Sequence, residues 1–144
     1  MAVLTATLRV VAPRWFVIGW LGCCAFLSSA SAASTALREY ELKAVFLFNF
    51  AQFVEWPATA FSDPQAPLVI GVLGEDPFGA FLDDTVRGEK ALGRTLTIRR
   101  YRTVDDIAAC HILFVSRSEA GRLEKIFAAL KGRSILTVGD LEGF

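Results

Sequence analysis

The order of apolar segments along the chain predicts an α/β fold, a layered sandwich in which helices flank a largely parallel or mixed sheet. A long helical pattern comes first, three strand-and-helix units come after it, and a last strand-like segment completes the pattern. Strands that alternate with helices are typical of parallel sheets that helices cover. The length suits a single domain, which we place at residues 33–144.

Residues 1–32 have the composition of a secretory signal peptide. Arg9 and Arg14 precede the apolar run at 15–27, and small residues come after that run. An A-x-A cleavage pattern occupies residues 30–32. We therefore expect export out of the cytoplasm. An uncleaved membrane anchor stays open as an alternative, although the apolar run is short for a membrane span.

Cleavage at this pattern would leave a mature chain that begins at Ala33. Another alternative is a lipoprotein acylated at Cys23. The whole chain carries 15 basic and 15 acidic residues, and both arginines of the signal segment leave with it, so the mature net charge is −2 with His111 neutral. The mature chain has no basic stripe, which argues against nucleic acid as a partner.

The segment EYELKAVFLFNFAQFVEWP predicts a helix from Thr35 or Leu37 to Glu55, which Pro57 ends. Its apolar side chains fill an arc of roughly 200°, about twice what a surface helix needs. They are Tyr40, Leu42, Phe46, Leu47, Phe50, Ala51, Phe53 and Val54. We expect this helix to lie between the sheet and another element. Its charged and amide residues argue against a membrane span.

The first strand-and-helix unit covers residues 66–88. APLVIGVLG is almost uniformly apolar, which predicts a strand covered on both faces. Asp76 stands at an N-cap position and Pro77 at the first helical position, so a short helix should run to Arg87 and stop at Gly88.

The second unit begins with residues 93–101, whose alternating pattern predicts a strand near an edge of the sheet. A turn of helix is expected at 103–109. CHILFVS, residues 110–116, is the most uniformly apolar strand, and we place it at the centre of the sheet. Few residues separate Tyr101 from Cys110, which is short for a parallel crossover.

The third unit opens at Ser116, which forms a capping-box pattern with Glu119. The helix it predicts ends at Gly132, and SILTVGD, residues 134–140, is the last strand. One face of this helix collects the apolar residues Leu123, Ile126, Phe127 and Leu130.

Polar residues stand directly after three of the predicted strands and form a candidate ligand site. Glu75 and Asp76 come after the first strand, Ser116 after the third, and Asp140 after the last. The carboxyl ends of parallel strands share one edge of a sheet, so these residues could hold a small polar ligand or a phosphate. Asp76 and Ser116 could equally be helix caps, and Asp140 a turn residue.

The sequence offers little for catalysis, and we expect neither an enzyme nor a cofactor or metal. Cys110 and His111 are adjacent in a strand and should point to opposite faces, which prevents a thiolate–imidazole pair. Ser116 lacks a G-x-S-x-G context, and no zinc-ligand spacing or G-x-G-x-x-G motif occurs. Because it is the lone cysteine of the mature chain and heads an apolar run, Cys110 is expected to be buried.

Four strings, taken together and in order, resemble the YfiR-like (DUF4154) family of periplasmic proteins. They are YELKAVFLFNFAQFVEWP, PLVIGVLGEDPFG, CHILFVSRSE and ILTVGDLEGF. The resemblance implies a periplasmic regulator that binds the sensor part of an inner-membrane diguanylate cyclase and represses it. An outer-membrane lipoprotein can sequester such a regulator, after which cyclic-di-GMP and biofilm formation rise.

The chain departs from the family pattern in two respects. Members usually continue with a Gly-rich strand and a final helix, so we expect this chain to lack its C-terminal strand and helix. Some relatives also pair the cysteine that matches Cys110 with a second one, whose position is occupied here by Gly71. That disulfide cannot form in this chain.

The partner surface is predicted on the polar side and at the end of the first helix. Phe48, Asn49, Gln52 and Trp56 are the candidates, with Phe48 as an exposed aromatic anchor. Core packing is the alternative for Phe48 and Trp56. A homodimer is also possible. The second functional hypothesis is a periplasmic small-molecule binding or sensor module without a cyclase partner, which would use the strand-end residues.

Overall fold

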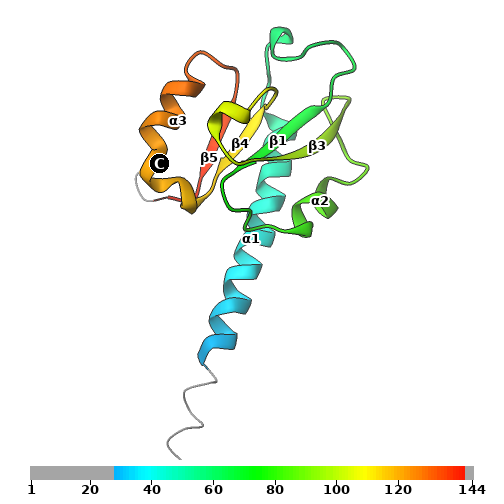
Figure 1. Ribbon diagram of the computed structural model, residues 1–144. Coiled ribbons are helices and arrows are strands. Elements are labelled where there is room, and N and C mark those ends of the chain that lie inside the picture. Colours follow the sequence, from blue (N-terminus) through cyan, green and yellow to red (C-terminus); the bar gives the residue numbers. More distant parts are fainter. Residues whose placement is uncertain (1–27, 142–144) are drawn as a thin grey trace, which may run out of the picture. The chain divides into compact units, whose positions relative to one another are not determined.

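The computed structural model describes residues 28–141 of the chain (Figure 1). The α-helices are α1 (Ser28–Phe53), α2 (Ala80–Val86) and α3 (Leu123–Leu130). The strands are β1 (Leu68–Leu73), β2 (Lys90–Ala91), β3 (Arg94–Tyr101), β4 (Ile112–Val115) and β5 (Leu136–Gly139). Short 3₁₀ helices are η1 (Ala58–Ala60), η2 (Val104–Asp106) and η3 (Arg117–Arg122). The chain divides into two units, residues 1–35 and residues 36–144, and the second unit contains the whole sheet.

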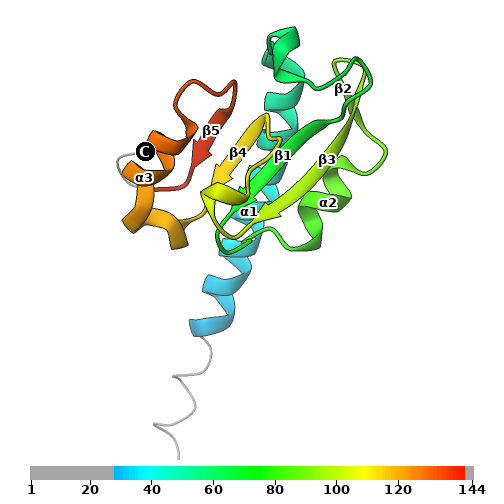
Figure 2. The same ribbon diagram turned by 45° about the horizontal axis from the view of Figure 1, so that its top comes forward.

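The described strands form one sheet in the order β2-β3-β1-β4-β5 (Figure 2). β1 pairs in parallel with both β3 and β4, and β5 pairs in parallel with β4, while the two-residue β2 is antiparallel to β3. The predicted α/β fold with a largely parallel sheet is confirmed. The predicted centre is wrong, because β1 lies there and β4 lies beside it. Both strands are wholly buried. The apolar composition of a strand therefore predicts its burial but not its position in the strand order.

The short connection between β3 and β4 is possible because it has little distance to cover. Tyr101 at the end of β3 is level with Leu73, and Ile112 at the start of β4 is level with Ile70. The chain therefore steps back by only a few residues along β1 while it crosses that strand. Between the two strands it forms η2, which confirms the turn of helix predicted there.

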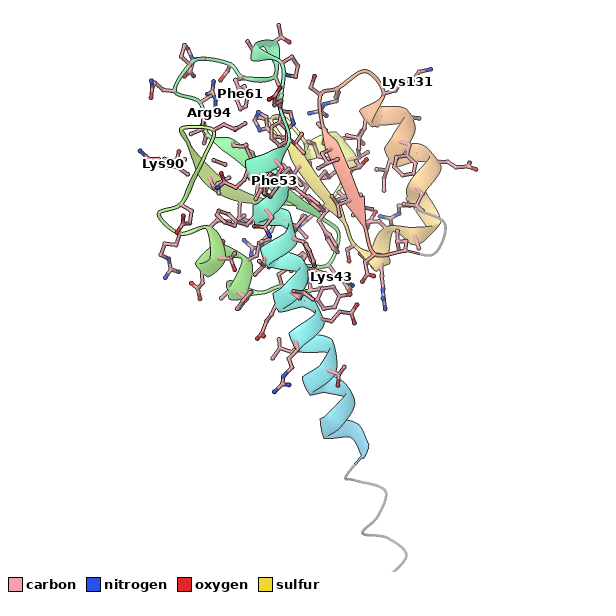
Figure 3. All side chains as sticks on the ribbon, turned by 180° about the vertical axis from the view of Figure 1, so that it is seen from behind. Lys43, Phe53, Phe61, Lys90, Arg94 and Lys131 are labelled. Carbon is pink, nitrogen blue, oxygen red and sulfur yellow. The ribbon has the colours of Figure 1, made fainter. Side chains whose placement is uncertain are left out.

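The sheet is packed on both faces. On one face, α1 and α2 cover a core that includes Leu47 and Leu82 (Figure 3). On the other face, η2 and α3 cover a second core that includes Ile107 and Ile126. Cys110 lies buried in this second core, as predicted. A two-faced arrangement of this kind explains why every residue of β1 is buried.

Helix α1 differs from its prediction at both ends. It begins at Ser28 instead of Thr35 or Leu37, because the Ala-rich stretch before Thr35 contains no Gly or Pro to stop a helix. It ends at Phe53 instead of Glu55, although the Val54 N–H still donates to the Phe50 carbonyl at 3.0 Å, so the two bounds differ by less than one helical turn. The expected cleavage pattern at 30–32 falls within this helix, and the rest of the predicted signal segment, residues 1–27, lies outside the described residues.

Within residues 28–141, no helix combines the length and the apolar composition that crossing a bilayer requires.

The start of α2 is also different from the prediction. The helix begins after Gly79, whose φ of 55° favours glycine, and not after Asp76. Asp76 instead accepts a hydrogen bond from the backbone N–H of Phe78 at 2.8 Å, which closes a turn before the helix. The predicted stop at Gly88 is confirmed, since α2 ends at Val86 and Gly88 has a φ of 77°.

The capping box predicted for Ser116 and Glu119 does not form. Ser116 makes no side-chain cap, and the 3₁₀ helix η3 precedes α3. The Glu119 side chain is buried and pairs with Arg122 at 3.3 Å, so it is not available to cap the helix start. Phe127 is exposed and does not lie on the buried face of α3, which Ile126 and Leu130 form.

Candidate functional site

Asp140, at the carboxyl end of β5, is surrounded by cationic and hydroxyl groups of its own chain. Lys43 lies 2.7 Å from its carboxylate and Arg117 lies 3.1 Å away, while the Tyr40 hydroxyl donates to it at 3.0 Å. Burial acts to raise the pKa of Asp140, but these hydrogen bonds outweigh it and hold the pKa below its usual value. The cluster ties α1 to the end of β5.

Asp76, after β1, belongs to a different ion-pair cluster. Its carboxylate lies 2.7 Å from Arg100, which also reaches Asp83 at 2.6 Å. The hydrogen bond to Arg100 is the main reason that the pKa of Asp83 is lowered. Arg100 thereby ties both the loop at Asp76 and the α2 residue Asp83 to β3.

The other two strand-end residues make local contacts. The buried Ser116 donates its backbone N–H to the Leu73 carbonyl at 3.0 Å. Glu75 is exposed, and its backbone N–H donates to the Ser118 hydroxyl at 3.0 Å. Different cations neutralise the carboxylates of Asp76 and Asp140, so the two residues belong to separate ion-pair clusters. A shared ligand site among the four residues stays a prediction.

The residues predicted to bind a partner have several internal contacts. Phe48 is half-buried and packs against the core below α1, so the exposure on which its prediction depends is not observed. Trp56 packs on the same core and donates its indole N–H to the His111 carbonyl at 3.3 Å. Gln52 donates to the Lys90 carbonyl at 2.9 Å, and Asn49 is half-buried. Their role in partner binding stays a prediction.

A second apolar surface lies on the side of α1 that faces away from the sheet. Leu42, Phe46 and Phe53 are 57%, 50% and 82% exposed, and Val45 is exposed as well. The spacing of these residues by threes and fours, continued by Asn49, places them on one side of the helix. We call these five residues the outer face of α1. Figure 3 views α1 from this side, with Phe53 labelled near the end of the helix.

The outer face is the part of the predicted apolar arc that we expected to pack against another element, and in residues 28–141 it is exposed to solvent instead. The sheet takes up only the part of that arc around Leu47 and Ala51, together with Ala44 and Phe48 beside it. Leu42, Phe46 and Phe53 at the other end of the arc remain in solvent. The excess width of the arc was the available signal for a second face.

An apolar groove of about 170 Å³ adjoins the outer face, between α1 and the β5 edge of the sheet. Phe46 and Phe50 form its α1 side, and Phe114 and Val138 form its floor. Phe46 therefore belongs to both the groove and the outer face. β5 ends the strand order, so the described residues leave its outer edge unpaired.

The described residues contain no arrangement that suggests chemistry. No group of three His, Cys, Asp or Glu side chains within 28–141 could hold a metal ion. Burial raises the pKa of the Cys110 thiol to about 12, which suppresses the thiolate that a nucleophile needs. Both ring nitrogens of His111 are engaged by backbone groups of Val69 and Ala60. An α/β sandwich with an exposed apolar helix face has the character of an interaction domain.

The comparison with protein families agrees with this character. The family model for YfiR/HmsC-like proteins, DUF4154, matches residues 40–144. The chain therefore belongs to the YfiR/HmsC-like family, whose members are regulatory proteins without catalytic activity that act in cyclic-di-GMP signalling. No curated protein matches the chain closely enough to count as a relative.

Proposed function

We propose that the protein is a periplasmic regulator that binds the periplasmic part of an inner-membrane diguanylate cyclase and represses it. Membership of a family that acts in cyclic-di-GMP signalling supports this function. Release of the regulator, for example by an outer-membrane lipoprotein that sequesters it, would then raise cyclic-di-GMP and favour biofilm formation. The charged, apolar and small-residue order of residues 1–32 supports export to the periplasm.

The exposed outer face of α1 is the observation that carries the proposal. Leu42, Phe46 and Phe53 present large apolar side chains to solvent on a single helix, which costs free energy unless a partner covers them. Asn49 lies among them, and Gln52 and Lys43 lie at the margins. In protein interfaces, most of the binding energy comes from a few apolar and aromatic residues that polar neighbours surround. The outer face therefore replaces Phe48 and Trp56 as the anchor of the proposed interface.

A double variant, Phe46→Ser with Phe53→Ser, tests the interface. Both side chains are half or more exposed, so their loss should change the free energy of unfolding little. Binding to the purified periplasmic domain of a candidate cyclase should weaken at least tenfold, about 1.4 kcal/mol, because aromatic anchors are worth that much or more. Surface plasmon resonance gives the affinity, and cellular cyclic-di-GMP gives the loss of repression.

Two control variants make the result specific. Phe81→Ser removes an aromatic side chain that is exposed on α2, and it should bind the cyclase as the parent does. Phe48→Ala should instead lower stability, because Phe48 packs on the core. Unchanged cyclase binding by the double variant would refute the outer face as the interface. A failure of every candidate cyclase to bind the parent protein would refute the cyclase partner.

The alternative function, a small-molecule module that uses the strand-end residues, has less support at that edge. Asp76 and Asp140 are each occupied by arginine or lysine side chains from the same chain. A ligand would have to compete with these ion pairs. A hollow of about 630 Å³ lies at this edge beside Arg117 and Asp140, and another of about 590 Å³ lies at the opposite edge of the sheet.

A further inference from the structure

A pocket of about 590 Å³ opens at the amino ends of β1, β4 and β5. The loop that contains Phe61, the segment just before β4 and the loop between α3 and β5 form its walls. Figure 3 shows the Phe61 loop and the end of α3, where Lys131 is labelled, at the same end of the domain. The volume is within the range of small-molecule sites, about 300–1,000 Å³.

The lining of this pocket is cationic. It contains Arg99 and Arg133, and the hydroxyls of Thr59, Ser62 and Ser134, but no Asp or Glu. His111 also lines it, and burial lowers the pKa of His111, so the imidazole is neutral near pH 7. The pocket therefore holds two positive charges without an acidic side chain to balance them.

Neither guanidinium group is paired with a carboxylate, in contrast to four other arginines of the domain. Arg87, Arg100, Arg117 and Arg122 each lie within 3.3 Å of a carboxylate oxygen. Among the described residues, Arg99 is exposed and its side chain makes no hydrogen bond or ion pair. Arg133 donates to the carbonyls of Ile107 at 2.8 Å and Ala108 at 3.2 Å, which orient it but leave its charge uncompensated.

The part of the pocket wall that His111 and Phe61 form is held in place by several contacts. The Val69 N–H donates to Nδ1 of His111 at 3.0 Å, which makes Nε2 the protonated nitrogen that donates to the Ala60 carbonyl at 3.2 Å. The imidazole also stacks on Phe61 with ring centroids 4.3 Å apart. The guanidinium carbon of Arg94 lies 3.7 Å from the centroid of the same Phe61 ring. A site whose walls are fixed before binding loses less entropy when a ligand enters.

We propose that this pocket binds a small organic anion through a phosphate or carboxylate group held by Arg99 and Arg133. Guanidinium groups recognise oxyanions through paired, charge-assisted hydrogen bonds. Phe61 and Ile135 supply apolar surface for the rest of the ligand, and the three hydroxyls supply further donors. The site lies apart from the outer face of α1, so it stands independently of cyclase binding and would add a sensing function to the domain.

Calorimetric titration of the whole purified chain with pyrophosphate and with citrate, in a buffer free of other multivalent anions, tests the site. Both probes should bind, and a neutral sugar should not. Arg99→Gln should weaken binding about tenfold to a hundredfold, the loss expected for a charge-assisted hydrogen bond. Because Arg99 is exposed and unpaired, this variant should fold as the parent does. Arg87→Gln, which removes an equal charge outside the pocket, should bind as the parent does.

Three results would overturn the proposal. The first is no heat of binding for either anion at millimolar concentration. The second is equal loss of affinity in Arg99→Gln and Arg87→Gln, which would indicate a general charge effect. The third is binding to vesicles that contain phosphatidylglycerol with no binding of soluble anions, which would indicate a lipid surface in place of a small ligand.

Discussion

Gly71, in the middle of β1, offers a sharp test of the packing between the sheet and the second core. A Cβ atom at this position would lie 2.7 Å from Cε2 of Tyr101, 2.8 Å from Sγ of Cys110 and 3.0 Å from Cδ1 of Leu113. Tyr101 cannot swing away easily, because its hydroxyl donates to the Ala109 carbonyl at 2.7 Å. Only glycine fits without a shift of these neighbours.

Gly71→Ala should therefore destabilise the domain by overpacking. Such insertions cost about 1–3 kcal/mol, which lowers the melting temperature by at least about 4 °C in a domain of this size. The free energy of unfolding from urea titration measures the loss. Stability equal to that of the parent would show that the described contacts of Gly71 are wrong.

Gly71→Cys should stabilise the domain once it is oxidised, whereas Gly71→Ala destabilises it. The contact of 2.8 Å between the new Cβ and the Cys110 sulfur is close to the distance of about 3 Å across one half of a disulfide, so the collision becomes a bond. The bond would close a loop of about 40 residues, for which the chain-entropy relation gives about 4 kcal/mol. The free energy of unfolding of the oxidised variant should thus exceed that of its reduced form by about 4 kcal/mol and that of the parent by about 1–3 kcal/mol.

The assay compares oxidised and reduced protein after refolding in a glutathione redox buffer. Refolding is needed because burial raises the pKa of the Cys110 thiol to about 12, so the folded protein reacts slowly. Gly71→Ser is the matched control that adds the same bulk without a crosslink. Two titratable thiols after oxidation would refute the geometry.

Two further predictions concern titration and ion pairing. Burial lowers the pKa of His111 in the folded state. Its contribution to the free energy of unfolding is therefore complete above the usual pKa of 6.5 and is lost as the pH falls below that value. Urea titrations at pH 7.5 and pH 5 should show a drop in the free energy of unfolding for the parent that His111→Gln lacks. An equal drop in both proteins would contradict this. Asp140→Asn should lower the free energy of unfolding by about 1–3 kcal/mol at pH 7, because Lys43 and Arg117 lose their shared carboxylate, whereas the exposed Asp105→Asn should change it little.

Much of the fold could be predicted because the relevant signals are local. The uniform apolar run of β1 predicts burial on both faces, and Gly88 and Gly132 mark helix ends where the backbone has positive φ. The start of α2 could not be predicted in the same way. Asp76 and Gly79 are both acceptable starts, and the choice depends on Arg100, which draws the Asp76 carboxylate toward β3. Such a contact between distant residues leaves no trace in the local pattern.

The candidate sites were harder to predict for the same reason. The strand-end carboxylates do lie where the topology places them, but the cations that neutralise them come from α1, β3 and η3. The cationic pocket was missed because Arg99 and Arg133 are far apart in the sequence and each looks like an ordinary surface residue there. What distinguishes them is that the fold brings both into the lining of one pocket that contains no Asp or Glu.

The composition of α1 reflects two demands on one helix. A helix that only covered a sheet would need an apolar stripe near Ala44, Leu47 and Ala51, with polar residues elsewhere. The exposed surfaces of Phe46 and Phe53 add nothing to that packing and increase the risk of aggregation, so stability does not explain them. A partner that covers the outer face does explain them, because the same side chains then become a source of binding energy. The small Ala44 and Ala51 let the backbone of α1 approach the sheet closely, which leaves the large aromatic residues available on the opposite side.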